Sequence, residues 1–305
     1  MPSFATEVKN ELAHQKPARK ECCRRAELAA LLRLGGQRPA ESPEGSLSFV
    51  TENAAVARLV LTLIKSELPG VLTKIAVSRG RRLKKTNSYA IMLLPSPTLN
   101  NLLNPADKGG RHKKSLDRYL VRRTCCQVAY LKGAFLARGS VSRPTADYHL
   151  EIATENQPLA ALIRDLLERL DFTPGDSERK DAYVVYLKEG EAVMDFLGML
   201  KAEAAVEAFE SAKNLKEVRG QVNRLVNCET ANLQRIGEAA ARQMEAIGKL
   251  DKVGLLPTLN KTLRETAAAR RNNPEASLAE LAAILCVSKS GLNHRLRKLM
   301  ELARG

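Results

Sequence analysis

Apolar and polar positions follow one pattern twice in the first two thirds of the chain. The vicinal pair Cys22-Cys23 recurs 103 residues later as Cys125-Cys126, and an apolar segment with helical spacing begins shortly after each pair. Thr51-Glu52-Asn53 recurs at the same offset as Thr154-Glu155-Asn156. Several blocks that share one offset indicate an internal duplication.

Each copy is predicted to contain a helix, two strands, a helix, two strands and a closing helix. The copies cover about residues 21–104 and 124–200. The segments expected from the periodicity are helix 21–34, strand 47–51, helix 53–67 and strands 71–77 and 88–94 in the first copy, then helix 156–170, strands from 172 and at 183–187, and a helix from 194 in the second. One copy alone would leave a sheet face uncovered. We therefore expect the opening helices to pair and form a saddle-shaped α+β domain over residues 1–200.

The C-terminal segment has the pattern of a helix-turn-helix at residues 277–303. Ser277-Leu278-Ala279-Glu280 is a capping box, which predicts a helix start. A tight turn is expected at Cys286, where glycine is common, and Ser288 is placed to cap a second helix. Leu292, Leu296 and Leu299 would face inward. The opposite face carries polar and basic residues: Lys289, Ser290, Asn293, His294, Arg295, Arg297 and Lys298.

The second helix of this pattern suits the major groove of double-stranded DNA. Ser290, Asn293 and His294 are candidates for reading base edges. Lys289, Arg295, Arg297 and Lys298 are candidates for phosphate contacts, because flexible cations bind the backbone readily. The alternative is a plain helical hairpin with a solvated face.

The segment that joins the two halves is rich in charge and alanine. We expect residues 201–220 to form a helical linker and residues 221–305 a helical DNA-binding domain. The many asparagines of residues 219–233 predict caps and turns, followed by helices at 229–250 and 255–271.

Charge narrows the class of partner. The 305 residues include 49 Lys and Arg against 34 Asp and Glu, a formal net charge of +15. This excess favours a polyanion, with nucleic acid first and an anionic membrane surface as the rival. The sequence shows neither a signal peptide nor an apolar run of membrane-spanning length. A cytoplasmic protein with reduced cysteines is therefore expected.

Two basic segments in the N-terminal half are candidates for phosphate contact, although such runs are also common in solvated loops. The first lies in a predicted hairpin turn and comprises Arg79, Arg81, Arg82, Lys84 and Lys85. The second precedes the repeated helix and comprises Lys108, Arg111, Lys113, Lys114, Arg118, Arg122 and Arg123.

The two vicinal cysteine pairs are interpreted as packing thiols. Neighbouring residues on a helix point about 100° apart, and zinc sites generally use pairs separated by two to four residues. No metal site and no cofactor are therefore expected.

Residues 131–139, Leu-Lys-Gly-Ala-Phe-Leu-Ala-Arg-Gly, resemble the signature helix of LAGLIDADG homing endonucleases, and residues 28–36 resemble a weaker copy. In that family the two helices pack closely and carry an acidic catalytic residue just before the final glycine. This sequence has Gly35 and Arg138 there. Glycine supplies no ligand and arginine repels Mg²⁺, so no catalytic residues are expected. The alternative is an endonuclease with unconventional ligands.

Taken with the terminal helix-turn-helix and the segment Asn223-Arg224…Asn227-Cys228-Glu229-Thr230-Ala231-Asn232, the chain resembles the WhiA family over nearly its whole length. The resemblance implies a nucleoid-associated DNA-binding regulator of cell division, chromosome segregation or sporulation, with a sigma region 4-like C-terminal domain. It implies a monomer whose protein partners include a sigma factor, RNA polymerase or a WhiB-like co-regulator. A non-enzymatic adaptor for division or sigma-like proteins is a further alternative.

Overall fold

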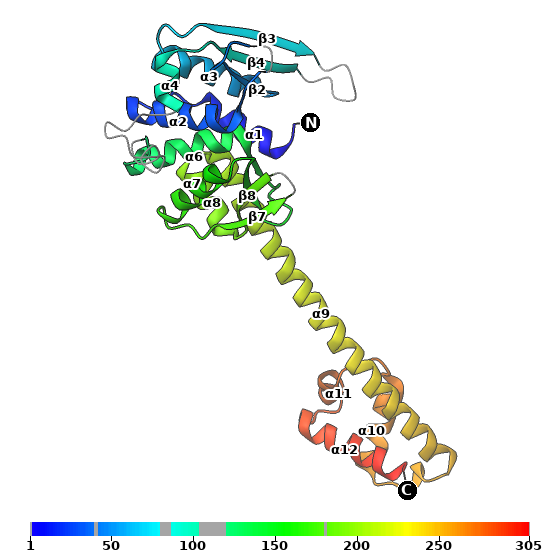
Figure 1. Ribbon diagram of the computed structural model, residues 1–305. Helices are drawn as coiled ribbons and strands as arrows, with labels where there is room; N and C mark the ends of the chain where they lie inside the picture. Colours follow the sequence, from blue (N-terminus) through cyan, green and yellow to red (C-terminus); the bar gives the residue numbers. More distant parts are fainter. Residues whose placement is uncertain (1, 40–41, 80–86, 104–119, 180–181, 305) are drawn as a thin grey trace. The chain divides into compact units, whose positions relative to one another are not determined.

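The computed structural model describes residues 2–39, 42–79, 87–103, 120–179 and 182–304 (Figure 1). The chain forms two compact units, Met1–Asn214 and Leu215–Gly305. Within the described ranges, no helix has both the length and the apolar character needed to cross a membrane.

The first unit contains the predicted duplication. After α1 (Phe4–His14), the first copy consists of α2 (Glu21–Gly35), β1 (Gly36–Gln37), β2 (Leu47–Thr51), α3 (Ala54–Glu67), β3 (Thr73–Arg79), β4 (Asn87–Leu93) and α4 (Pro97–Leu103). The second copy consists of α6 (Thr124–Arg138), β5 (Gly139–Val141), β6 (Leu150–Thr154), α7 (Gln157–Glu168), β7 (Gly175–Arg179), β8 (Ala182–Leu187) and α8 (Gly190–Met199). The order of elements is as predicted, with β3 and β7 starting two or three residues later than expected and α8 four residues earlier.

The two sheets have the same antiparallel topology. Their strand orders are β1-β2-β4-β3 and β5-β6-β8-β7. Ile91 of β4 pairs with Phe49 of β2, and Ile152 of β6 pairs with Val185 of β8. All four side chains are buried beneath the helices. Because successive residues of a strand face opposite sides, Val50, which is 44% exposed, lies on the other face of the first sheet.

The repeated Thr-Glu-Asn motif starts a helix in each copy. The side chain of Asn53 accepts the backbone N–H groups of Ala55 and Val56, and Asn156 accepts that of Leu159. The threonine two residues earlier accepts the backbone N–H of each asparagine. The motif therefore recurs because it holds the strand-to-helix turn before α3 and before α7.

Close packing of α2 against α6 joins the two copies. The helices lie side by side, with the strands of one copy on one side of the pair and those of the other copy on the opposite side (Figure 1). A Cβ atom at Gly133 would lie 2.3 Å from the carbonyl oxygen of Glu27 and 2.9 Å from Cβ of Ala30. Only glycine permits this approach, so the contact depends on position 133.

A buried ion pair lies at the same crossing. The Glu27 side chain is 2% exposed and its carboxylate lies 3.3 Å from Nζ of Lys132. Burial raises the pKa of Glu27, and the Lys132 ammonium opposes this by favouring the charged form. The pair links α2 to α6 across the boundary between the copies.

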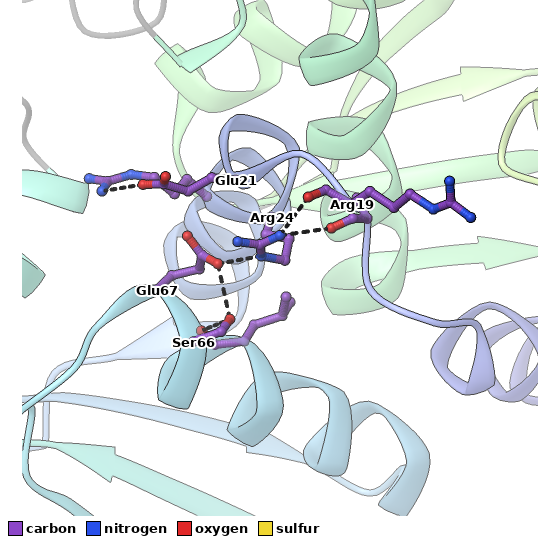
Figure 2. Close-up of polar contacts among 8 residues, drawn as sticks. Arg19, Glu21, Arg24, Ser66 and Glu67 are labelled. Carbon is purple, nitrogen blue, oxygen red and sulfur yellow. Dashed lines mark hydrogen bonds and ion pairs between the residues drawn. The ribbon is translucent and has the colours of Figure 1, made fainter.

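The first turn of α2 is held by a second polar network, centred on Arg24 (Figure 2). The Arg24 Nε donates to the buried carboxylate of Glu67 at the end of α3, and its Nη1 donates to the carbonyl oxygens of Ala18 and Arg19. The Ser66 hydroxyl also donates to Glu67. One guanidinium therefore joins α2, the end of α3 and the segment before α2.

The predicted turns within residues 219–233 are wrong, because these residues belong to one helix, α9 (Glu203–Lys252). Residues 203–220 of the expected linker and the expected helix 229–250 are parts of the same helix. Each asparagine costs a helix only about 0.7 kcal/mol relative to alanine. Apolar residues spaced three and four apart, such as Leu215, Val218 and Val222, keep the helical pattern through the segment and are exposed.

The second unit packs the end of α9 with η1 (Leu256–Thr258), α10 (Lys261–Asn272), α11 (Leu278–Ile284) and α12 (Lys289–Leu302). The helix predicted at 255–271 begins at 261 instead, where Asn260 caps it by accepting the N–H of Leu263. The core of this unit consists of leucines, alanines and one isoleucine: Ile247, Leu250, Leu263, Ala267, Ala269, Leu281, Ala282, Leu292, Leu296 and Leu299.

Arg270 of α10 is buried within this small core, with 2% of its surface exposed. Its Nη1 donates to the carbonyl oxygens of Ala276, at 2.6 Å, and of Asn273. Burial lowers the pKa of Arg270. The side chain thereby fixes the loop that leads into α11.

Replacing Lys132 with methionine should lower the free energy of unfolding by about 3–5 kcal/mol, because it leaves Glu27 buried and unpaired. The pKa of Glu27 would then rise further, so the folded state would bind a proton more tightly than the unfolded state. The loss should therefore be largest well above the ordinary carboxyl pKa of 4.5 and fade as the pH falls towards it. Urea denaturation of single variants and of Glu27→Gln/Lys132→Met measures the effect. A loss independent of pH and not relieved in the double variant would contradict it.

Arg270→Met should destabilise the second unit by about 1.5–3 kcal/mol, because it removes a charged donor from the Ala276 carbonyl while keeping the apolar stem. Hydrogen exchange of the α11 and α12 amides, alongside urea denaturation, measures the change. Arg264→Met is the matched control, since Arg264 lies on the same helix and is exposed. Equal protection in the two variants would show that Arg270 does not hold this loop.

Candidate nucleic-acid interface

The helix-turn-helix begins with the predicted capping box. The backbone N–H of Ser277 donates to the Glu280 carboxylate at 2.7 Å, and the N–H of Glu280 donates to the Ser277 hydroxyl at 3.2 Å. The hydrogen bond from the Ser277 backbone lowers the pKa of Glu280. The box therefore fixes where α11 starts.

The turn between α11 and α12 is formed at Cys286, a position where glycine is common in helix-turn-helix motifs. Cys286 has a φ of 52°, which is the left-handed region that favours glycine. Its backbone N–H donates to the Ala283 carbonyl, and that of Val287 donates to the Ala282 carbonyl. The backbone at this turn therefore has the conformation that glycine adopts most easily. The next residue, Val287, packs against the core of this unit.

Ser288 caps α12 by accepting the N–H of Gly291 at 3.1 Å. Its hydroxyl also lies 3.2 Å from that of Ser290. Leu292, Leu296 and Leu299 are buried, so the opposite face of α12 lies outward. The rotation of the helix is thus set by three leucines and one cap.

The outward face of α12 is basic. Ser290, His294 and Arg297 follow one another at helical spacing along its middle and are exposed, whereas Asn293 and Arg295 lie at its flanks and are half buried. Lys289 and Lys298 are also exposed. In the part of the chain that the structure describes, none of the four cations Lys289, Arg295, Arg297 and Lys298 has an ion pair or hydrogen bond through its side chain. These side chains are therefore available to an anionic partner.

The basic residues of the N-terminal half are only partly described. Arg79 is exposed at the end of β3, opposite Asn87. Arg122 and Arg123 are exposed just before and at the N-cap of α6. The remaining members of the two segments lie outside the described residues: Arg81, Arg82, Lys84, Lys85, Lys108, Arg111, Lys113, Lys114 and Arg118.

The positions that would hold acids in an endonuclease lie at the ends of α2 and α6. A Cβ atom at Gly35 would lie 2.4 Å from the ring of Phe49, so this position has no room for a side chain. The Arg138 Nε donates to the carbonyl oxygen of Leu34, and its guanidinium lies 3.8 Å from the carboxylate of Glu155.

Lys9 of α1 adds a second cation near Arg138, and sequence analysis did not predict it. Burial, and secondarily the charge of Arg138, lower the pKa of Lys9 to about 8. No periodicity marks α1 as a neighbour of α6, because the two are separated by more than a hundred residues. The ends of the helix pair therefore have two cations, Lys9 and Arg138, the second of them close to the carboxylate of Glu155.

The structure also brings together the cysteines that were expected only to pack. The thiols of Cys22, Cys23, Cys125 and Cys126 all lie within 4.8 Å of one another. Side chains that point about 100° apart on one helix can therefore still bring their sulfurs close together where an equivalent pair faces them. The duplication was the available signal, since it places equivalent pairs on two helices that pack together.

Family models match the chain in three consecutive segments. The WhiA N-terminal LAGLIDADG-like domain matches residues 21–105, the WhiA LAGLIDADG-like domain matches residues 127–219, and the WhiA C-terminal HTH domain matches residues 222–303. The helix-turn-helix described above lies inside the last match. Together the three matches support the predicted combination of a duplicated domain and a helix-turn-helix.

Relatives that match nearly the whole chain are named as cell division proteins. Probable cell division protein WhiA of Desulforamulus reducens is 44% identical over 309 residues, which cover 99% of this chain and 95% of the relative. The protein of that name from Brevibacillus brevis is 41% identical over 307 residues, with coverage of 99% and 96%.

Two crystal structures share the fold. Full-length DUF199/WhiA from Thermatoga maritima has a TM-score of 0.62 and 25% identity, covering 99% of this chain and 98% of that one. The N-terminal LAGLIDADG domain of DUF199/WhiA has a TM-score of 0.52 and 21% identity, covering 66% and 91%. The predicted fold class is confirmed, and the chain belongs to the WhiA family.

Proposed function

We propose that this chain is a DNA-binding transcriptional regulator of cell division that inserts α12 into the major groove of double-stranded DNA. The observation that carries the proposal is the basic face of α12, whose four cations have no partner in the described part of the chain. The cell-division role rests on the relatives named probable cell division protein WhiA. Chromosome segregation and sporulation are narrower roles of the same kind, and a DNA-bound regulator would lie at the nucleoid.

Each outward residue of α12 has a proposed task. Asn293 presents a side-chain amide at the flank of the helix, which is the group that pairs with adenine, while Ser290 and His294 offer hydrogen bonds to other base edges. Lys289, Arg295, Arg297 and Lys298 would contact phosphates and set the register. The Ser290 hydroxyl also forms a hydrogen bond with the hydroxyl of Ser288, which caps α12. A contact between Ser290 and DNA would therefore also stabilise this cap.

The first unit is proposed to bind DNA or protein without cutting DNA. Strand β3 is exposed along its whole length and includes the basic residues Lys74 and Arg79, which suit contact with phosphates. At the helix ends, Gly35 has no space for a carboxylate and Arg138 and Lys9 would repel a divalent cation. These contacts support the absence of nuclease activity.

Asn293→Ala should weaken binding to the specific site by about 1–3 kcal/mol and relax its base preference, while leaving nonspecific binding nearly unchanged. Lys298→Ala should weaken binding to all sequences alike and reduce the slope of log K against log salt by about 1. Fluorescence anisotropy with a site selected from random DNA measures both. Lys261→Ala is the control, since Lys261 is an exposed cation on α10. Unchanged affinity in both α12 variants would exclude this helix as the reader and favour an adaptor.

Incubation of the full-length protein with supercoiled plasmid and Mg²⁺ should leave the plasmid uncut, because the ends of α2 and α6 supply cations in place of metal ligands. Agarose electrophoresis detects nicked and linear products. Arg138→Ala is the matched variant and should be equally inactive, since it adds no carboxylate. Cleavage at stoichiometric protein that EDTA abolishes would instead support the endonuclease alternative.

A further inference from the structure

Four thiols from the two copies meet where α2 and α6 begin. Cys22 and Cys23 lie in the first turn of α2, and Cys125 and Cys126 occupy the equivalent places in α6. All four sulfurs lie within 4.8 Å of one another. Cys23 and Cys126 are buried, and Cys22 and Cys125 are half buried. We propose that these cysteines form a binding site for one Zn²⁺ ion that joins the two copies.

The spacing of the sulfurs fits a single tetrahedral ion. Zn²⁺ with four thiolate bonds of about 2.3 Å holds its sulfurs about 3.8 Å apart, so small rotations of the side chains would close the observed cage around it. A polynuclear iron–sulfur cluster needs more room between its ligands. A disulfide would use only two sulfurs and gives no reason for four thiols to converge.

The surroundings of the four thiols favour negative charge. The positive ends of two helix dipoles meet there, because α2 and α6 both begin at the cluster. Arg123, at the N-cap of α6, adds a full positive charge near the Cys22 thiol. Positive helix ends and a nearby cation stabilise a thiolate–metal centre, whose net charge is negative.

A cation would take the place of the thiol protons. Cys23 and Cys126 are buried, and burial raises the pKa of both thiols. A hydrogen bond with Cys126 lowers the pKa of Cys22. Binding of Zn²⁺ forms four Zn–S bonds, breaks four S–H bonds and releases four protons to solvent.

The site would act at the opposite end of the helix pair from Gly35 and Arg138. Both helices have 15 residues, and each runs from the thiols to the end where Arg138 contacts Leu34. The crossing is already fixed at its middle by Gly133 and at its far end by Arg138. A bound ion would fix the third point, where the Arg24 network already holds the first turn of α2 (Figure 2).

Metal content of the full-length protein, prepared without an affinity tag in zinc-supplemented medium and kept reduced, tests the proposal. Mass spectrometry of the metal should give one zinc per chain, released when the thiols are blocked with a mercurial reagent. Co²⁺ in place of Zn²⁺ should give the intense visible bands of a tetrahedral tetrathiolate site. Removal of the ion with a strong chelator should lower the melting temperature of the first unit.

Cys22→Ser/Cys126→Ser should lose the zinc, whereas Cys228→Ser/Cys286→Ser should keep it, because those two cysteines are exposed and lie elsewhere. Circular dichroism checks that both variants are folded. The Co²⁺ spectrum of the unaltered protein tests the site even where a variant fails to fold. Zinc content in the unaltered protein no higher than in Cys22→Ser/Cys126→Ser, a Co²⁺ spectrum without thiolate bands, or disulfides among these cysteines with zinc present would each overturn the assignment.

Discussion

The first unit depends on the close approach of α2 and α6. Gly133 brings its backbone against the carbonyl of Glu27, and no other residue could occupy that place without moving one helix. The approach buries Glu27, whose charge then needs Lys132, and it brings the equivalent cysteines of the two copies into one cluster. The contact therefore places polar groups in the core of the unit as a consequence of its geometry. Each of these polar groups belongs to one copy and has its partner in the other copy. Either copy alone would therefore leave its buried polar groups without partners.

The second unit depends on a different device, because its core is small. Helix α11 has only seven residues, and leucines alone would leave the turn between α11 and α12 poorly fixed. Two serine caps set where the helices start, the left-handed Cys286 sets the turn, and the buried Arg270 holds the carbonyl groups that lead into α11. These polar contacts orient α12 so that its leucines face the core. The basic face is thus a consequence of the same rotation.

Sequence periodicity predicted the elements of both copies because each follows its own local chemistry. The Thr-Glu-Asn motif and the apolar spacing act within a few residues, and so do the caps of α11 and α12. The asparagines of α9 misled the prediction because a weak local preference for turns is outweighed by a continuous helical pattern. Lys9 and the convergence of the four sulfurs were missed because they depend on how α1, α2 and α6 pack. The symmetry axis that relates the two copies decides which side chains meet. The spacing of residues within one helix carries no information about where that axis lies.

The C-terminal ends of α2 and α6 bring groups of the same charge together. Two helices that converge at their C-termini place unsatisfied carbonyl groups and negative dipole ends close together. In this chain Arg138 donates a hydrogen bond to one of those carbonyl groups, that of Leu34, and Lys9 adds a second cation nearby. An acid at position 35 would meet both the ring of Phe49 and the same negative dipole ends without a metal to offset them. Arg138 and Lys9 therefore offset part of the negative charge that the helix ends bring together, which stabilises the helix pair.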